Sequence, residues 1–413
     1  MNLIESLLAD AAQITALRRE IHAHPELCFQ EEHTAELVAR KLAEWGIPVH
    51  RGLGRTGVVG IVRGGDSPRA IGLRADMDAL PMTEFNQFAH ASRQPGKMHA
   101  CGHDGHTAML LAAAQHLAAH RRFDGTVYLL FQPAEEGGGG AREMIKDGLF
   151  RQFPMDAVFG MHNWPGLKVG QFAVCEGSCM ASSNEFRIVV HGRGAHGAMP
   201  HLAIDPVPVA CQMVQAFQTI ISRNMRPTEA GVISVTMIHA GEATNVVPDS
   251  CEIQGTVRTF TIALLDQIEQ RMADIARHTA AAFGATAAFE FHRNYPPTIN
   301  HAAEAALVRD VMRETVGVDN CLRFEPAMTA EDFSYFLLER PGAYFFIGNG
   351  DGTHRLAYES RTAGSGDGAS ISGLGPCTLH NPHYDFNDDL IPLGATLWVR
   401  LVEKWFAVPV SSG

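Results

Sequence analysis

The segment MHACGHDGH at positions 98–106 concentrates side chains that bind transition metals. It holds three histidines, a cysteine and an aspartate, and all three residue types are metal ligands in proteins. Cys101 and His103 are two residues apart, a spacing that lets neighbouring side chains on a tight loop converge on adjacent metal ions. The chain has 21 histidines, so chance competes as an explanation of this one segment. By itself the segment indicates half of a metal site.

Further polar residues of the same kind follow apolar stretches elsewhere in the chain. Alone, a histidine at a strand end is more often a hydrogen-bonded core residue, and a glutamate pair is more often a solvated turn. Consecutive residues on extended backbone point to opposite sides, so one glutamate of a pair can bind a metal while the other takes a proton from water. These candidates are Asp76, Asp78, Glu135, Glu136, His162 and His380.

The elements that carry these residues alternate between apolar strands and amphipathic helices. This alternation predicts an α/β sheet with helices on both faces. Ligands bind such sheets outside the carboxyl ends of the strands, and four separate segments place their polar residues there or just before a helix. That convergence makes the metal site the favoured interpretation. Strands are expected at 56–62, 70–80, 125–136 and 156–162, and helices at 3–20, 31–46 and 106–120.

The pattern changes from about residue 184 onward. The order becomes strand, helix, strand, strand, helix, strand, which is typical of a ferredoxin-like split βαβ unit. After residues 295–300 the α/β pattern resumes, with a helix near 302–316, a strand at 343–348 and a final helix near 389–407. We therefore expect a domain of residues 184–296 inserted into a larger domain formed by residues 1–183 and 297–413.

Composition narrows the class of function. A chain of 413 residues is long enough for two domains, and 46% hydrophobic with 19% charged residues is ordinary for a globular protein. A net charge of −12 without a basic run disfavours nucleic acids and anionic membranes and favours small-molecule substrates. The acidic N-terminus lacks a signal-peptide pattern, no membrane-spanning apolar run occurs, and eight cysteines are scattered, so we expect a reduced, cytoplasmic protein.

Longer motifs resemble one enzyme family over nearly the whole chain, from LRREIHAHPEL at 17–27 to the last helix. The chain resembles the peptidase M20 family, and within it the amidohydrolase branch of hippurate hydrolases, N-acyl-amino-acid amidohydrolases and plant auxin-conjugate hydrolases. The resemblance implies a zinc-peptidase-like α/β catalytic domain with an inserted ferredoxin-like α+β domain that serves as lid and dimerisation domain. The motifs are RADMDALPM, MHACGHDGHTAMLL, FQPAEEGGGGA, GMHNWP, GRGAHGAMPH, ATNVVPD, GTVRTF, AEDFSYF and LHNPHYDFND.

The resemblance also implies roles for individual residues. Glu135 would be the general base, and Asp76 and Asp78 would orient the ligands from behind. The Cys101 thiolate would replace the bridging carboxylate of other branches, and two divalent ions, Zn, Mn, Co or Ni, would bind each subunit. The implied metal ligands are Cys101, His103, Glu136, His162 and His380.

Three residues of the inserted domain complete the implied site. His196 would donate a hydrogen bond to the substrate carbonyl, in its own subunit or in a neighbouring one. Asn245 and Arg258 would bind substrate, with Arg258 suited to the α-carboxylate of the product amino acid. The remaining members of the opening segment, His99, Asp104 and His106, would support the ligands or cap the following helix.

The expected activity is metal-dependent hydrolysis of an N-acyl-amino acid to a carboxylic acid and a free amino acid, by a homodimer or higher homo-oligomer. A dipeptidase or carboxypeptidase of the same family is one alternative. A non-catalytic metal-binding protein is another, although the extra carboxylate of AEE has no use in a structural site. The segment 353–375 is longer than usual for the branch and precedes His380, so its effect on substrate preference stays open.

Overall fold

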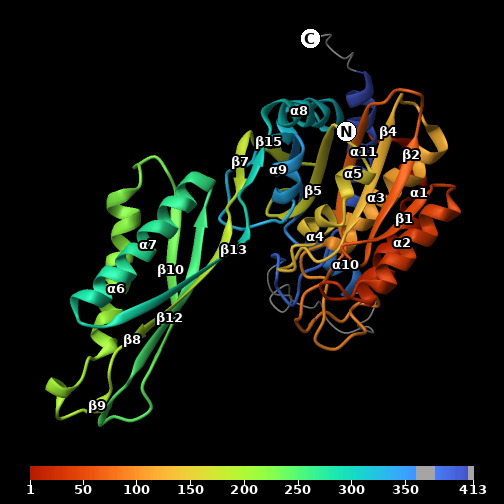
Figure 1. Cartoon of the computed structure of the whole chain (residues 1–413). Coiled ribbons are helices and arrows are strands. Elements are labelled where there is room, and N and C mark those ends of the chain that lie inside the picture. Colours follow the sequence, from red (N-terminus) through yellow and green to blue (C-terminus); the bar gives the residue numbers. More distant parts are fainter. Residues whose placement is uncertain (360–376, 408–413) are drawn as a thin grey trace, which may run out of the picture. The chain divides into compact units, whose positions relative to one another are not determined.

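The computed structural model describes residues 1–359 and 377–407, so most of the long 353–375 segment lies outside the described residues. The chain divides into two compact units (Figure 1). The first unit comprises Met1–Gly177, Asn300–Glu325 and Tyr335–Gly413, and the second comprises Ser178–Ile299 and Pro326–Ser334. The second unit thus contains the short stretch Pro326–Ser334 in addition to the segment around the expected insertion.

An eight-stranded sheet forms the centre of the first unit. Its middle strands β4, β3, β5 and β16 are parallel neighbours, whereas β1, β2 and β4 pair antiparallel. The carboxyl ends of the parallel strands therefore meet at one edge. In spatial order the strands are β1 (Val49–Leu53), β2 (Gly57–Arg63), β4 (Thr126–Gln132), β3 (Ala70–Asp76), β5 (Ala157–Pro165), β16 (Gly342–Gly350), β6 (Phe172–Val174) and β15 (Cys321–Arg323).

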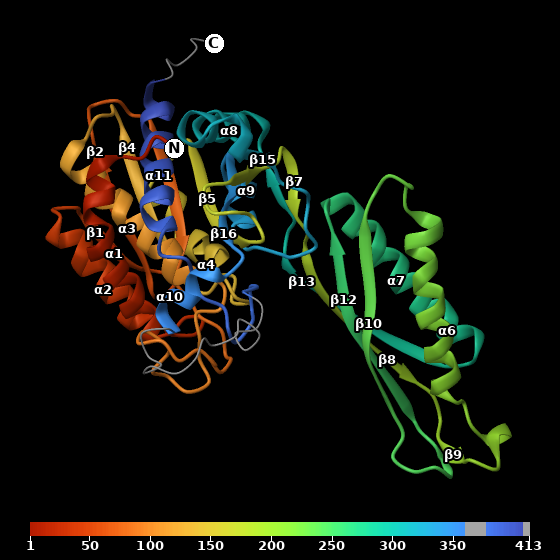
Figure 2. The ribbon, with the colours of Figure 1, turned by 180° about the vertical axis from the view of Figure 1, so that it is seen from behind.

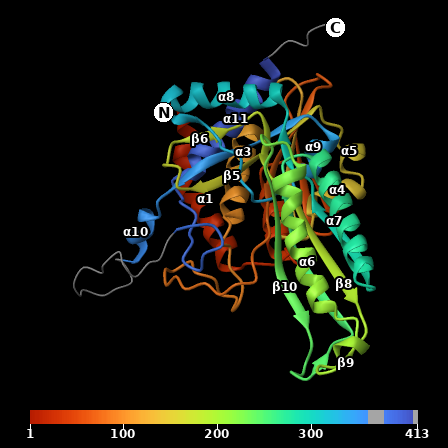
Figure 3. The same ribbon diagram turned by 90° about the vertical axis from the view of Figure 1, so that its left-hand side faces the viewer.

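Five helices share one hydrophobic core with alternate residues of these strands. Two of them, α3 and α11, are apolar around most of their circumference, as expected for helices buried inside a core. The short helices α4 (Gly140–Lys146) and α5 (Leu149–Gln152) lie on the other side of the sheet from α1 (Figure 3). The five helices are α1 (Glu5–Ala23), α2 (Glu32–Glu44), α3 (His103–His120), α8 (Ala302–Val316) and α11 (Leu390–Ala407).

The second unit contains an antiparallel sheet in the order β10-β12-β8-β13, which is the strand order of a split βαβ unit. Helices α6 and α7 pack side by side on one face of it (Figure 2). Asp205 and Thr261 cap these helices by accepting hydrogen bonds from the Val207 and Leu264 amides. The elements are β8 (Ser183–His191), α6 (Pro206–Thr219), β10 (Gly231–Ala240), β12 (Ser250–Thr259), α7 (Ile262–Ala282) and β13 (Thr286–Tyr295).

Shorter elements complete the described chain. In the second unit β9 (Ala195–His196) pairs with β11 (Val246–Val247), and β7 (Gly177–Met180) pairs with β14 (Thr298–Asn300). No helix among the described residues is both long and apolar enough to span a lipid bilayer. The remaining helical turns are η1 (Pro200–Leu202), η2 (Ile220–Asn224), η3 (Val318–Asn320), α9 (Ser334–Glu339), η4 (Thr353–Arg355) and α10 (Leu356–Glu359).

Several boundaries differ from the sequence-based expectation: β3 ends at Asp76 instead of residue 80, β4 ends at Gln132 instead of residue 136, and two further differences bear on the site. Strand β5 continues to Pro165, so His162 lies inside the strand and does not end it. The reason is that β16 pairs alongside, with Phe346 opposite His162 and Gly348 opposite Trp164, and extends the ladder. Helix α3 begins at His103, three residues before the expected start, because Gly102 adopts a left-handed conformation (φ 100°) that ends the preceding loop.

Candidate metal centre

The residues singled out in the first unit gather at the carboxyl ends of its parallel strands. Asp76 ends β3 and pairs in register with Gln132, the last residue of β4. Glu135 and Glu136 follow β4 after a two-residue turn, and His162 lies near the end of β5. The convergence that the strand ends predicted is therefore present in the structure.

A tight turn sets the spacing between Cys101 and His103. Gly102 between them has φ 100°, and a Cβ atom there would clash with the side chains of Asn163 and Tyr384. Glycine alone fits this conformation and this close approach. The turn places Cys101 just before α3 and makes His103 its first residue, so both side chains face the same site.

Two histidines are oriented by backbone carbonyls. The Nδ1 atom of His103 lies 2.8 Å from the carbonyl oxygen of Asp78, and Nδ1 of His162 lies 2.6 Å from that of Asn163. A carbonyl that accepts a hydrogen bond from Nδ1 directs Nε2 toward the site, which is the arrangement of histidines that bind a metal. The Nε2 atom of His103 is buried without a hydrogen bond, and that of His162 lies 3.4 Å from the Cys101 sulfur.

Potential ligand atoms form overlapping groups around Cys101. Cys101, His103 and His162 have ligand atoms within 4.8 Å of one another. So do Cys101, Glu136 and His380, and Cys101 belongs to both groups. His380 reaches the site from a loop where it adopts φ 58° and donates its amide hydrogen to the Ala100 carbonyl. A sulfur shared by two ligand groups is the geometry that a bridging thiolate requires.

The charge of the site favours a cation. Burial and then the carboxylates of Glu136 and Glu135 raise the pKa of Cys101 well above its usual value. Burial lowers the pKa of His103, but the neighbouring carboxylates outweigh it and raise this pKa to about 10, so the buried site is strongly acidic. The Nε2 atom of His103 is buried without a hydrogen bond, and Oε1 of Glu136 lies 3.1 Å from Nε2 of the candidate ligand His380, so a metal would satisfy buried polar atoms here. The donor set of sulfur, imidazole and carboxylate fits Zn, Mn, Co or Ni.

Asp78 fixes the direction of the glutamate pair. Its two carboxylate oxygens accept hydrogen bonds from the amides of Glu135 (3.0 Å) and Glu136 (2.9 Å). The structure therefore gives Asp78 contacts to both glutamates and, through its carbonyl, to His103. Glu135, only 6% exposed, has its carboxylate within 4.8 Å of ligand atoms of His103 and Glu136.

Asp76 contacts His106, a residue to which the motif assigned no single role. Its Oδ1 atom lies 2.6 Å from Nδ1 of His106, and the other ring nitrogen of His106 lies 2.7 Å from Oδ1 of Asn163. Asn163 in turn donates to the hydroxyl of Tyr384 at 2.6 Å. Sequence reasoning named neither Asn163 nor Tyr384, although GMHNWP and NPHYDF place each beside a candidate ligand.

Comparison with known proteins assigns the family. The chain matches the profile of peptidase family M20/M25/M40 over residues 72–362. A hippurate hydrolase of Campylobacter jejuni is 38% identical over 406 residues, which cover 98% of this chain and 100% of the relative. The chain belongs to the M20 family.

Two further M20 relatives cover almost the whole chain. Thermostable carboxypeptidase 2 of Saccharolobus solfataricus is 40% identical over 414 residues, which cover 98% of this chain and 99% of the relative. A crystal structure from Bacillus subtilis, described as a dinuclear metal binding peptidase of the M20 family, superposes with a TM-score of 0.80 at 30% identity. It covers 97% of this chain and 99% of that one. The likeness at this level includes both units of the M20 fold.

The opening segment of this M20 chain has two members that serve neither as ligands nor as helix caps. Asp104 lies 2.7 Å from Nε of Arg18 and 2.9 Å from Nδ1 of His22, and all three side chains are fully buried. Asp104 thus compensates charges of α1, and its other carboxylate oxygen, Oδ1, is buried without a hydrogen bond. His99 is also buried, and burial lowers its pKa to about 4.

The three candidates of the second unit are not brought together there. His196 pairs with Val246, and the Asn245 carbonyl accepts a hydrogen bond from Gly197, so His196 and Asn245 are neighbours on exposed chain. Arg258 lies near the opposite end of the sheet, eight residues along β12 from Ser250, which is about 25 Å at the rise of a strand. His196 and Arg258 of one second unit cannot contact the same small substrate.

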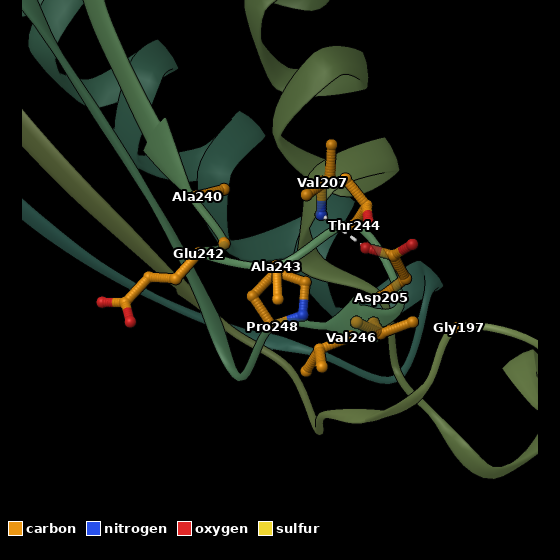
Figure 4. A pocket seen from close by; sticks show the side chains of 11 residues that line it. Gly197, Asp205, Val207, Ala240, Glu242, Ala243, Thr244, Val246 and Pro248 are labelled. Atoms are coloured by element: carbon orange, nitrogen blue, oxygen red, sulfur yellow. Dashed lines mark hydrogen bonds between the residues drawn. The ribbon is translucent and has the colours of Figure 1, made fainter.

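A pocket lies beside His196 in the second unit. It has a volume of about 480 Å³ and is lined by Gly197, Val246 and residues at the end of β10 (Figure 4). Of its acidic lining residues, Asp205 is occupied in capping α6, as the dashed line in Figure 4 shows. None of the groups of potential metal ligands in the described chain lies among the residues that line it.

Proposed function

We propose that this protein is a metal-dependent amidohydrolase that cleaves N-acyl-amino acids of the hippurate type into a carboxylic acid and a free amino acid. The observation that carries the proposal is a buried carboxylate, that of Glu135, beside overlapping groups of potential metal ligands. A structural metal site needs no such group, whereas a hydrolytic site needs a base beside the activated water. The relative named hippurate hydrolase supports this substrate class.

Two divalent ions, Zn, Mn, Co or Ni, are proposed to bind each subunit. His103 and His162 would hold one ion and Glu136 and His380 the other, with Cys101 between them. When bound, the ions supply Lewis acidity and lower the pKa of water from about 15.7 toward about 7. Glu135 accepts a proton from the attacking water and returns it to the leaving amine. Asp76 and Asp78 hold the ligands and the base in place during both transfers.

The second unit is proposed to act as lid and dimerisation domain, with Asn245 and Arg258 binding substrate. Because His196 and Arg258 lie at opposite ends of their own sheet, His196 is proposed to serve the site of a neighbouring subunit in a homodimer. Exposed apolar side chains near His196, including Met199 (49% exposed), Leu202 (53%) and Val246 (53%), support an interface at that end. The small-molecule substrate is then the protein's only other partner, with no role for nucleic acids or membranes.

We also place the protein in the cytoplasm. All eight cysteines are free, and several are buried, which is typical of a reducing compartment.

Substitution Glu135→Gln tests the proposed function. The amide cannot accept the proton, so we expect kcat for benzoyl-glycine to fall roughly 100- to 10,000-fold. Metal content per chain, measured by plasma emission, should stay at the wild-type value because Glu135 is not a proposed ligand. Glu5→Gln at an exposed position of α1 is the matched control and should retain full activity. Unchanged turnover by Glu135→Gln would refute the assignment of the base.

A carboxypeptidase or dipeptidase is the second candidate, because a relative of that name is 40% identical. Metal-reconstituted protein should be assayed with a panel of benzoyl- and acetyl-amino acids and with unblocked dipeptides of the same residues. We expect higher kcat/KM for the acylated compounds. A preference for free dipeptides would select the alternative.

A further inference from the structure

Strained backbone is concentrated around one residue that has no assigned role. Among the described residues, the non-glycine positions with left-handed φ angles are Phe29 (62°), Arg55 (74°), Ala134 (53°) and His380 (58°). Such conformations cost roughly 1–3 kcal/mol each and persist where surrounding structure imposes them. His380 is a proposed ligand. The other three all lie beside Glu31, at the start of α2.

Glu31 holds two of these strained residues directly. Its Oε1 atom accepts hydrogen bonds from the amides of Phe29 (2.9 Å) and Ala134 (2.8 Å). Its Oε2 atom accepts one from the Thr56 hydroxyl (2.6 Å), which follows Arg55 in the turn before β2. The side chain of Glu31 is completely buried. One carboxylate therefore ties together three separate segments of the first unit.

Glu31 and Asp78 act on consecutive residues of the same turn. The amide of Ala134 binds Glu31, and the next two amides, those of Glu135 and Glu136, bind Asp78. Three successive N–H groups are thus fixed by two buried carboxylates. This fixes the backbone from which the Glu135 side chain projects, and the left-handed Ala134 is the residue immediately before it.

The arrangement is unfavourable for stability by itself. Burial and the nearby charge of Asp78 raise the pKa of Glu31 to about 7, although the hydrogen bonds from Thr56 and Ala134 act in the opposite direction. Two like charges in a buried space, together with left-handed residues, are typical of sites where function outweighs stability.

We propose that Glu31 is a positioning residue that sets the direction of the Glu135 carboxylate by holding the Ala134 amide in its left-handed turn. The proposal rests on the proposed function, in which Glu135 is the general base. Glu31 itself touches neither substrate nor metal, and it acts through its reach across the turn and not through its charge.

Two substitutions test whether the length of the Glu31 side chain or its charge is needed for activity. Glu31→Gln keeps the reach, since its amide oxygen can accept from both backbone amides while its NH₂ group donates to the Thr56 oxygen. Glu31→Asp keeps the charge but is one carbon–carbon bond shorter and cannot span Phe29, Ala134 and Thr56 together. We expect Glu31→Asp to lower kcat roughly 10- to 100-fold, with KM and metal content unchanged. Glu31→Gln should retain kcat to within about threefold.

The exposed neighbour Glu32 provides the control, because Glu32→Asp makes the same chemical change one residue away and should leave kcat unchanged. Circular dichroism and metal content establish that each variant is folded and loaded. If Glu31→Asp does not fold, Thr56→Val tests the same clamp by removing the donor to Oε2, and kcat should then fall several-fold at constant KM.

Three results would overturn the proposal: wild-type kcat in a folded Glu31→Asp protein, equal losses in the Asp and Gln variants, or loss of bound metal as the cause of inactivity. If Glu31→Asp does not fold, wild-type kcat in Thr56→Val would overturn it as well. The Glu135→Gln variant separates this failure from failure of the proposed function. An inactive Glu135→Gln protein with fully active Glu31→Asp would refute only the role of Glu31, whereas an active Glu135→Gln protein would refute the catalytic assignment itself.

Discussion

Cys101 is the residue at which the two groups of ligand atoms meet. It is buried, its sulfur lies 3.4 Å from Nε2 of His162, and it also belongs to the group with Glu136 and His380. A second thiol, that of Cys28, is nearby but donates to the Glu136 carbonyl at 2.9 Å and to Asp78 at 3.3 Å. The two cysteines therefore differ in what they can do for a metal.

Cobalt substitution tests this difference. Protein loaded with Co²⁺ should show a near-ultraviolet thiolate-to-metal charge-transfer band, because Cys101 is the proposed soft anionic ligand. Cys101→Asp should lose the band while still binding cobalt through a carboxylate. Cys28→Ser is the control and should keep the band. If the band persisted in Cys101→Asp and disappeared in Cys28→Ser, Cys28 and not Cys101 would be the metal ligand.

At the residue scale, sequence reasoning named the candidate metal ligands and two of the residues that position them, Asp76 and Asp78, but it missed others. Cysteine and histidine in a short motif have a recognisable chemistry, and Glu135 stood beside Glu136 in a strand-end pair. Glu31 resembles any glutamate before a helix, and Tyr384 resembles any aromatic residue. Their roles depend on contacts with residues more than a hundred positions away, such as Ala134 and Asn163.

At the scale of elements, α1 contacts two segments that carry proposed ligands. Arg18 is fully buried and lies 2.7 Å from Asp104 at the start of α3 and 2.5 Å from Asp385 in the loop after His380. Burial and Arg18 disfavour protonation of the neighbouring His22, yet hydrogen bonds to Asp104 and Glu84 outweigh them and raise its pKa to about 10. The first helix is thus an ionic anchor for the site.

Removing Arg18 should therefore weaken the fold and the site together. Arg18→Leu leaves buried aspartates without their counter-charge, a change that costs about 3–5 kcal/mol. We expect that loss in the free energy of unfolding measured by urea titration. Metal affinity should also fall, because the segments that carry His103 and His380 lose a common anchor.

The neighbouring Arg19→Leu variant is the control for this prediction. Arg19 pairs with Asp388 but is partly exposed, so its loss should cost less than about 1 kcal/mol. Equal effects of the two substitutions would show that burial of the Arg18 network does not matter.

At the scale of the whole molecule, the distribution of functional residues over the two units is the feature to explain. The proposed ligands and base belong to the first unit, whereas His196, Asn245 and Arg258 belong to the second. Within the second unit, the length of β12 separates His196 from Arg258. A closed dimer is the simplest assembly that lets one second unit serve two sites.

Mixing two inactive variants tests whether His196 acts on a partner subunit. Glu135→Gln lacks the base and His196→Ala lacks the donor, so each homodimer should be inactive. Subunit exchange would create heterodimers with one intact site, and random mixing should restore about a quarter of wild-type activity. An active His196→Ala homodimer would place His196 outside catalysis. No recovery by two inactive variants, despite exchange shown by native mass spectrometry of tagged chains, would place His196 in its own subunit's site.

Periodicity and local chemistry made the order of the elements predictable from the sequence alone. Alternation of apolar residues gave β3, β4 and β5, and the change of pattern near residue 184 gave the antiparallel sheet with α6 and α7. Capping residues such as Asp205 and the glycine at position 102 act on their immediate neighbours. Such features survive in a linear sequence because the interactions that cause them span only a few residues.

The tertiary structure decided which polar groups face one another. Pairing with β16 extended β5 beyond His162. Asp104 contacts Arg18 of α1, and Glu31 accepts a hydrogen bond from the Ala134 amide. Each of these outcomes depends on side chains that are far apart in the sequence and buried together, where an unpaired charge or amide is costly. Pairing in the core is a property of the folded chain as a whole, and no local pattern of residues specifies it.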